Sequence, residues 1–142
     1  MFLNSIKTGT VKGLETTWML GKVIIPVYLI VTVLEHTPVI DWISNVFAPF
    51  MTFFNLPGEA AIILVLGNVL NLYAAIGAIT AISLTAMEVT IIAIMLSFSH
   101  SLIVETAVTK KMGISVKKVL FVRLGLAIIF GIVIGQLGGI IW

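Results

Sequence analysis

The chain has 142 residues, of which 60% are hydrophobic and only 10% are charged. No soluble domain of this size has such a composition, so the sequence predicts one all-α integral membrane domain. The net charge of +2 is too small to indicate a nucleic-acid partner, and the absence of cysteine excludes disulfides and thiolate ligands. The first long apolar run, 23–34, is not followed by a small-residue cleavage site and is expected to be a retained anchor.

Two helices are expected in the first third of the chain. Residues 1–17 mix charged and apolar residues at helical spacing, which predicts an interfacial segment that runs into a transmembrane helix over 18–36. Thr37 followed by Pro38 is a helix-start signal. In 38–54 the polar and small residues share one face, which predicts an amphipathic helix in the membrane plane. A packing helix of the soluble type is the alternative.

The segment 56–84 is apolar enough to enter a bilayer and carries a single charge, Glu59. Gly67, Asn68 and Asn71 interrupt it about ten residues after its start. This break predicts a re-entrant hairpin, in which two half-helices meet near mid-depth and return to the side from which they entered. Broken backbone at that depth is tolerated only where protein or a wet cavity surrounds it, and transporter sites are commonly built in this way.

A second transmembrane helix is expected over 87–106, with an unusual polar content. Ser97, Ser101 and Glu105 are spaced four residues apart and would share one stripe of a continuous helix, with His100 beside it. Ionisable groups inside a membrane are costly, so they mark a pathway or a site by default. The alternative is a structural contact of His100 with serine, or of Glu105 with a nearby lysine, that holds the helix end.

The last transmembrane helix is expected over 115–142. Lysines and Gly113 before it are the residues expected to close the preceding helix. Within this last helix, Gly131, Gly135 and Gly139 recur every four residues, which predicts a smooth face for close approach of another helix.

The basic residues indicate the topology. If the hairpin returns to its own side, the chain crosses three times, and the N-terminus lies on the same side as the loop at 107–118. All basic residues then fall on or near one side: Lys7, Lys12, Lys22, Lys110, Lys111, Lys117, Lys118 and Arg123. By the positive-inside rule, this pattern predicts a cell-membrane protein with its N-terminus in the cytoplasm and its C-terminus outside.

Three stretches resemble the Gate, or nucleoside-recognition, family: residues 56–60 (LPGEA), 72–75 (LYAA) and 99–111 (SHSLIVETAVTKK). That family includes membrane domains of the bacterial ferrous-iron transporter and the small spore-maturation membrane proteins, with the concentrative nucleoside transporters as distant relatives. The resemblance implies one repeat made of a helix, an in-plane helix, a re-entrant hairpin and two further helices. Iron-transporting members typically carry a cysteine near the hairpin, and this chain has none.

An odd number of crossings is compatible with an inverted repeat, because a second copy that follows the first in one chain then has the opposite orientation in the membrane. Only one copy is present in this sequence, so the other half is expected from a second Gate-family chain of opposite topology. A homo-oligomer is the runner-up, since the strong lysine asymmetry opposes dual insertion.

Seven residues are candidates for contact with a substrate. Glu59 is expected at the start of the first half-helix, as a ligand or as a helix cap. The side-chain amides of Asn68 and Asn71, at the hairpin tip, would form hydrogen bonds either with a solute or with the unpaired backbone groups of the helix break. The full set is Glu59, Asn68, Asn71, Ser97, Ser99, His100 and Glu105.

The function expected from these features is that of a transporter subunit for a small polar solute or cation. A membrane scaffold or assembly protein that does not transport is the alternative, and a membrane-embedded hydrolase is a third hypothesis. The sequence shows no metalloprotease, phosphate-binding or dinucleotide motif, so an enzyme is not expected, and no cofactor is implied. Whether a metal binds is left open.

Overall fold

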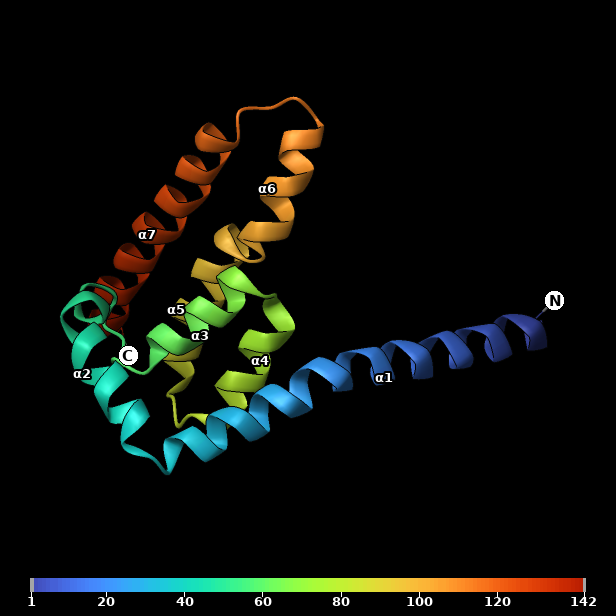
Figure 1. Cartoon of the computed structure of the whole chain (residues 1–142), viewed down its shortest axis with the longest axis horizontal. Helices are drawn as coiled ribbons and strands as arrows, with labels where there is room; N and C mark the ends of the chain where they lie inside the picture. Colours follow the sequence, from blue (N-terminus) through green and yellow to red (C-terminus); the bar gives the residue numbers. More distant parts are fainter. Residues whose placement is uncertain (1, 142) are drawn as a thin grey trace.

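The computed structural model describes residues 2–141, with side chains for all of these except residues 3 and 139–141. The described residues form helices joined by short connections, as Figure 1 shows. Three segments are long and apolar enough to cross a membrane: Asn4–Glu35, Ala86–Lys111 and Val116–Gly138. The expected all-α membrane architecture is therefore confirmed.

The first helix, α1, runs without interruption from Phe2 to Glu35. The expected interfacial segment and the expected first span thus belong to one helix. At ~1.5 Å per residue, 34 residues extend about 50 Å, which exceeds the ~30 Å hydrocarbon core. The N-terminal half projects away from the other helices, while the C-terminal half lies beside α4 (Figure 1).

Helix α2 spans Pro38–Met51 and starts where the sequence predicts. The Thr37 side chain accepts a hydrogen bond from the Val39 N–H over 3.4 Å, and Pro38 occupies the first turn. Pro49 does not end the helix, which passes into a short 3₁₀ turn, η1, over Thr52–Phe54.

The predicted helical hairpin is present as α3 (Ala60–Val69) and α4 (Leu72–Ala81). The break falls at Leu70 and Asn71, so Gly67 and Asn68 still belong to α3. Buried alanines on both helices let the pair pack closely, and Ala60, Ala74, Ala75 and Ala78 have no exposed surface.

The prediction of one continuous helix over 87–106 is wrong, because the structure has two helices in this segment. Helix α5 spans Ala86–Ser99 and α6 spans Leu102–Lys111, with a sharp turn between them. Ser101 has a left-handed backbone conformation (φ 53°), which interrupts the helix, and the extended backbone of His100 precedes it. The expected stripe of Ser97, Ser101 and Glu105 along one helix face is therefore absent.

The last helix, α7 (Val116–Ile141), packs along α5. A Cβ added to Gly131 would lie 2.8 Å from Met95 Cγ and 2.9 Å from Phe54 Cδ1, and at Gly135 it would overlap the Phe54 carbonyl. These two glycines thus allow close packing within the chain, because the absence of a side chain lets η1 and α5 approach α7. Gly139, the third glycine of the predicted face, lies outside the described side chains.

The core is formed mainly by residues of α3, α4 and α5, with single residues from α1, α2 and α7. Its largest side chains without exposed surface are Ile63, Ile91, Ile92 and Leu96. Gly77 allows α4 to approach α1, since an added Cβ would lie 2.8 Å from the Ile24 carbonyl oxygen. This packing fixes the hairpin against the other helices and sets where its tip lies.

Candidate functional site

The two helix breaks meet. The N–H of Ser101, in the α5–α6 turn, donates a hydrogen bond to the carbonyl oxygen of Gly67, near the hairpin tip, over 2.9 Å. Gly67 permits this approach because an added Cβ would lie 2.6 Å from Leu96 Cδ2 and 3.1 Å from the Ala75 Cβ. The ends of four short helices are thus gathered at one place: the C-termini of α3 and α5 and the N-termini of α4 and α6.

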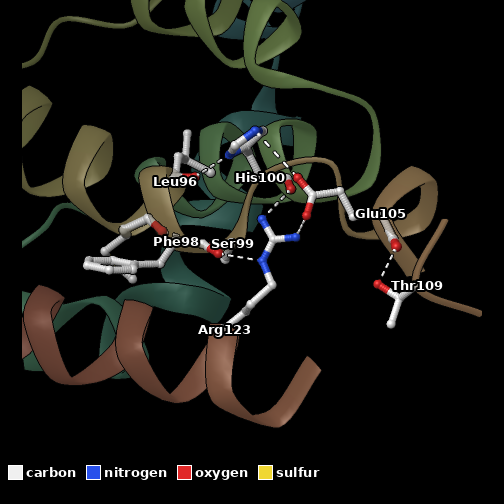
Figure 2. Close-up of polar contacts among 8 residues, drawn as sticks. Leu96, Phe98, Ser99, His100, Glu105, Thr109 and Arg123 are labelled. Carbon is white, nitrogen blue, oxygen red and sulfur yellow. Dashed lines mark hydrogen bonds and ion pairs between the residues drawn. The ribbon is translucent and has the colours of Figure 1, made fainter. Parts of the chain in front are cut away.

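Three ionisable side chains lie at this meeting point (Figure 2). Glu105, in the first turn of α6, forms an ion pair with Arg123 of α7 through Oε2, while its Oε1 lies 3.7 Å from His100 Nε2. The Arg123 side chain is 17% exposed, compared with 34% for His100 and 41% for Glu105. The cluster is therefore only partly shielded, and its histidine and carboxylate remain accessible.

Arg123 also closes the broken end of α5. Its Nε donates to the Phe98 carbonyl over 2.7 Å, and a second nitrogen donates to the His100 carbonyl over 3.2 Å. These carbonyls belong to the last turn of α5, which lacks helical partners and carries partial negative charge. With the Glu105 ion pair, each of the three guanidinium nitrogens has a partner.

Arg123 was not among the predicted site residues, although a signal existed. It is the only arginine in the sequence, and it lies inside the long apolar run of the last span. Inside a membrane such a charge is expected to face the protein interior and to have a partner. The sequence does not reveal that Glu105 is this partner, because the turn at His100 and Ser101 sets the direction of α6.

The His100 ring has a defined hydrogen-bonding pattern. Its Nδ1 lies 2.9 Å from the Leu96 carbonyl oxygen. A carbonyl only accepts, so Nδ1 carries a hydrogen, and in the neutral ring the Nε2 atom is then an acceptor. In the neutral ring, His100 Nε2 and Glu105 Oε1 therefore face each other as two acceptors, 3.7 Å apart, whereas in the protonated ring the same two groups form an ion pair.

The two asparagines of the hairpin differ in role. Asn71 caps α4, because its Oδ1 accepts a hydrogen bond from the Ala74 N–H over 3.0 Å. Asn68 donates from Nδ2 to the Leu64 carbonyl over 2.7 Å, but its buried Oδ1 has no hydrogen-bond partner. Asn68 Oδ1 is thus a buried acceptor without a partner, in the residue next to Gly67, whereas the Asn71 oxygen is occupied.

The side chains of the other predicted site residues form no hydrogen bond with the ionisable cluster, although Ser99 directly precedes His100. Glu59 is at the opposite end of α3, about 14 Å along its axis from Asn68. Its side chain does not cap the helix but accepts a hydrogen bond from Ser44 Oγ over 2.9 Å. Ser97 and Ser99 donate to carbonyls of their own helix, those of Ile94 and Met95.

Among the described residues, no three histidine or acidic side chains come close enough together to hold a metal ion. His100 and Glu105 form a pair only, and Arg123 lies against the carboxylate. The arrangement is therefore a polar site at a junction of broken helices. It is lined by hydrogen-bond acceptors and by one cation, Arg123, whose nitrogens are all bonded within the chain.

A helical membrane chain with three candidate spans and a junction of two broken helices is the class of protein that the fold defines. Comparison with known families assigns the chain to one family of this class. The chain belongs to the Gate family, described as nucleoside recognition, whose model matches residues 17–116. The match includes both helix breaks, while Arg123 lies beyond it.

Two bacterial membrane proteins are similar to this chain. It is 55% identical over 126 residues to the membrane protein YvoD of Bacillus subtilis (strain 168), a match that covers 89% of this chain and 40% of YvoD. It is 31% identical over 96 residues to the inner membrane protein YjiG of Escherichia coli (strain K12), covering 65% of this chain and 60% of YjiG. The chain thus spans less than two thirds of either relative. No solved structure matches it.

Proposed function

We propose that this chain is one repeat of a membrane transporter for a small polar solute or cation. The observation that carries the proposal is the junction itself, where the Ser101–Gly67 hydrogen bond joins the two helix breaks beside His100, Glu105 and Arg123. Discontinuous helices that meet near mid-membrane are the usual frame of a transporter site. In this proposal the hairpin α3–α4 is re-entrant.

The unused acceptors indicate the chemistry of the solute. With His100 neutral, His100 Nε2, Glu105 Oε1 and the buried Asn68 Oδ1 all accept, while the nitrogens of Arg123 are already bonded. A ligand that brings N–H or O–H donors, or a positive charge, satisfies these atoms. A buried acceptor without a partner costs about 1–3 kcal/mol, which such a ligand would recover.

The second half of the transporter is proposed to come from a Gate-family partner of inverted topology. Because 126 aligned residues make up 40% of YvoD, about 190 residues of that relative lie outside the match. That length is sufficient for a second repeat of this size. A homo-oligomer of this chain is the competing arrangement.

Uptake by cells that express the chain with its partner tests the proposal. Metabolites in the medium and in the cells are compared by mass spectrometry for the native chain, for Asn68→Ala with His100→Ala, and for Thr90→Ala. Thr90 is exposed and bonds only to the Ala86 carbonyl of its own helix, so it is the matched control. We expect a solute whose uptake the double variant abolishes and the control retains. Equal uptake by all three proteins would overturn the proposal.

A membrane scaffold that does not transport is the alternative function. Substitution of Gly131 or Gly135 by leucine does not separate the two functions, because these glycines pack against Phe54 and α5 within the chain. Substitutions in the exposed N-terminal half of α1, such as Lys7→Gln with Lys12→Gln, separate the two functions better. A scaffold would lose its partners when that surface changes and would tolerate His100→Ala.

A further inference from the structure

The connection between α6 and α7 carries a dense positive charge. Lys110, Lys111, Lys117 and Lys118 lie within nine residues, all four are exposed, and no acidic residue follows Glu105 in the sequence. Within the described chain, the ion pairs involve His100, Glu105 and Arg123 and none of these lysines. The charge of this connection is therefore not neutralised by the protein itself.

The two pairs of lysines differ in their helical setting. Lys110 and Lys111 are in the last turn of α6, where the helix dipole favours cations. Lys117 and Lys118 are in the first turn of α7, which has no acidic residue and where the dipole disfavours them. A negative group from outside the chain is the expected partner of this second pair.

An apolar groove begins at one of these lysines. It has a volume of about 370 Å³ and is lined by Lys117, Leu120, Phe121, Leu124, Gly125 and Ile128, all on one face of α7. Phe121 is 79% exposed, and Gly125 leaves the middle of the groove open, since nothing lies within 4 Å of an added Cβ. The groove therefore has a cation at one end and hydrocarbon along the rest.

This shape and charge fit one kind of molecule. We propose that an anionic phospholipid binds here, with its phosphate at Lys117 and Lys118 and an acyl chain along the groove past Gly125. Clusters of basic residues at the end of a membrane helix attract anionic headgroups. Met112 and Ile114, which are 67% and 49% exposed in the same connection, would lie at the headgroup–acyl boundary.

Native mass spectrometry of the purified full chain in detergent tests the proposal. The probes are phosphatidylglycerol and phosphatidylcholine with identical acyl chains, added in equal amounts. We expect the native chain to retain phosphatidylglycerol about tenfold better, and Lys117→Gln with Lys118→Gln to remove that preference. Lys7→Gln with Lys12→Gln removes the same charge from α1 and is expected to leave the preference intact.

A third variant separates the headgroup from the acyl chain. Gly125→Leu fills the groove and is expected to reduce retention of both lipids while the lysines stay in place. Glycerol 3-phosphate has the headgroup chemistry without the chains and is expected not to displace the lipid. Circular dichroism checks that every variant is folded.

Three results would overturn the proposal. The first is equal retention of the two lipids by the native chain. The second is an equal loss of preference in the α1 control. The third is a dimer that Gly125→Leu abolishes, because a second protein chain would then occupy the groove.

Discussion

The N–H of Ser101 and the carbonyl oxygen of Gly67 are joined by a hydrogen bond of 2.9 Å, which connects the turn between α5 and α6 to the end of α3. The Gly67 carbonyl is in the last turn of α3 and the Ser101 N–H directly precedes α6, so both groups belong to helix ends that lack helical partners. Because hydrocarbon supplies no partners, broken backbone at membrane depth must be satisfied by protein or by water. The two breaks therefore stabilise each other, and neither is expected to persist alone.

Replacement of Arg123 by alanine is expected to destabilise the chain by about 2–4 kcal/mol. The change leaves the Phe98 and His100 carbonyls and the Glu105 carboxylate without their donor, and hydrogen bonds to charged groups contribute about 1.5–3 kcal/mol each. Unfolding in mixed detergent measures the loss. Arg123→Lys should recover only part of it, because an ammonium cannot span all three acceptors. Native stability in Arg123→Ala would contradict the bonding described.

Gly67→Ala is expected to cost about 1–3 kcal/mol through overpacking. The added methyl would lie 2.6 Å from Leu96 Cδ2, the far end of a fully buried side chain. Leu96→Val should therefore relieve part of the strain in the double variant, although it costs stability alone. A double-mutant cycle by thermal unfolding measures the coupling. Gly13→Ala, which has nothing within 4 Å, is the control and should not destabilise.

Asn71→Ala is expected to cost about 0.5–2 kcal/mol, the usual effect of losing a helix N-cap. The lost bond is that from the Ala74 N–H to Asn71 Oδ1. Asn71→Ser and Asn71→Asp should restore both stability and uptake if the residue acts as a cap alone. Restored stability without restored uptake would instead assign a solute contact to this side chain.

Asn68→Ala is expected to change stability little and to abolish uptake. The variant loses one bond within α3, to the Leu64 carbonyl, but it also removes the buried oxygen that has no partner. Thermal unfolding and uptake are measured on the same preparation. A large loss of stability would show that Asn68 is a structural residue of the hairpin.

The glycines of α7 should differ in their sensitivity to alanine. At Gly135 the added methyl would overlap the backbone of Phe54, which cannot move without shifting η1. At Gly131 its nearest neighbours are side-chain atoms of Met95 and Phe54, and methionine adapts readily. Gly135→Ala is therefore expected to be the more destabilising of the two. The order is measured on dilute protein, where contacts between chains make no contribution.

Much of the fold could be predicted from the sequence because the membrane imposes simple rules. Apolar runs of sufficient length give spans, Thr37 followed by Pro38 starts α2, and the polar interruption of 56–84 gives a helical hairpin. Gly113, with φ 74°, follows α6 at the expected place. These signals are local, so each can be read from a few neighbouring residues.

The candidate site depended on contacts that are distant in the sequence. The break at Ser101 carries no glycine or proline, so the segment reads as one helix, and the left-handed conformation there is compensated by the bond to Gly67, 34 residues earlier. The partners of Glu105 were likewise set by the direction of α6 after that break. The sequence determined which polar residues the membrane would have to accommodate. Only the tertiary structure decided that Arg123, rather than a lysine of the loop, neutralises Glu105, because that pairing needs α7 packed beside the broken end of α5.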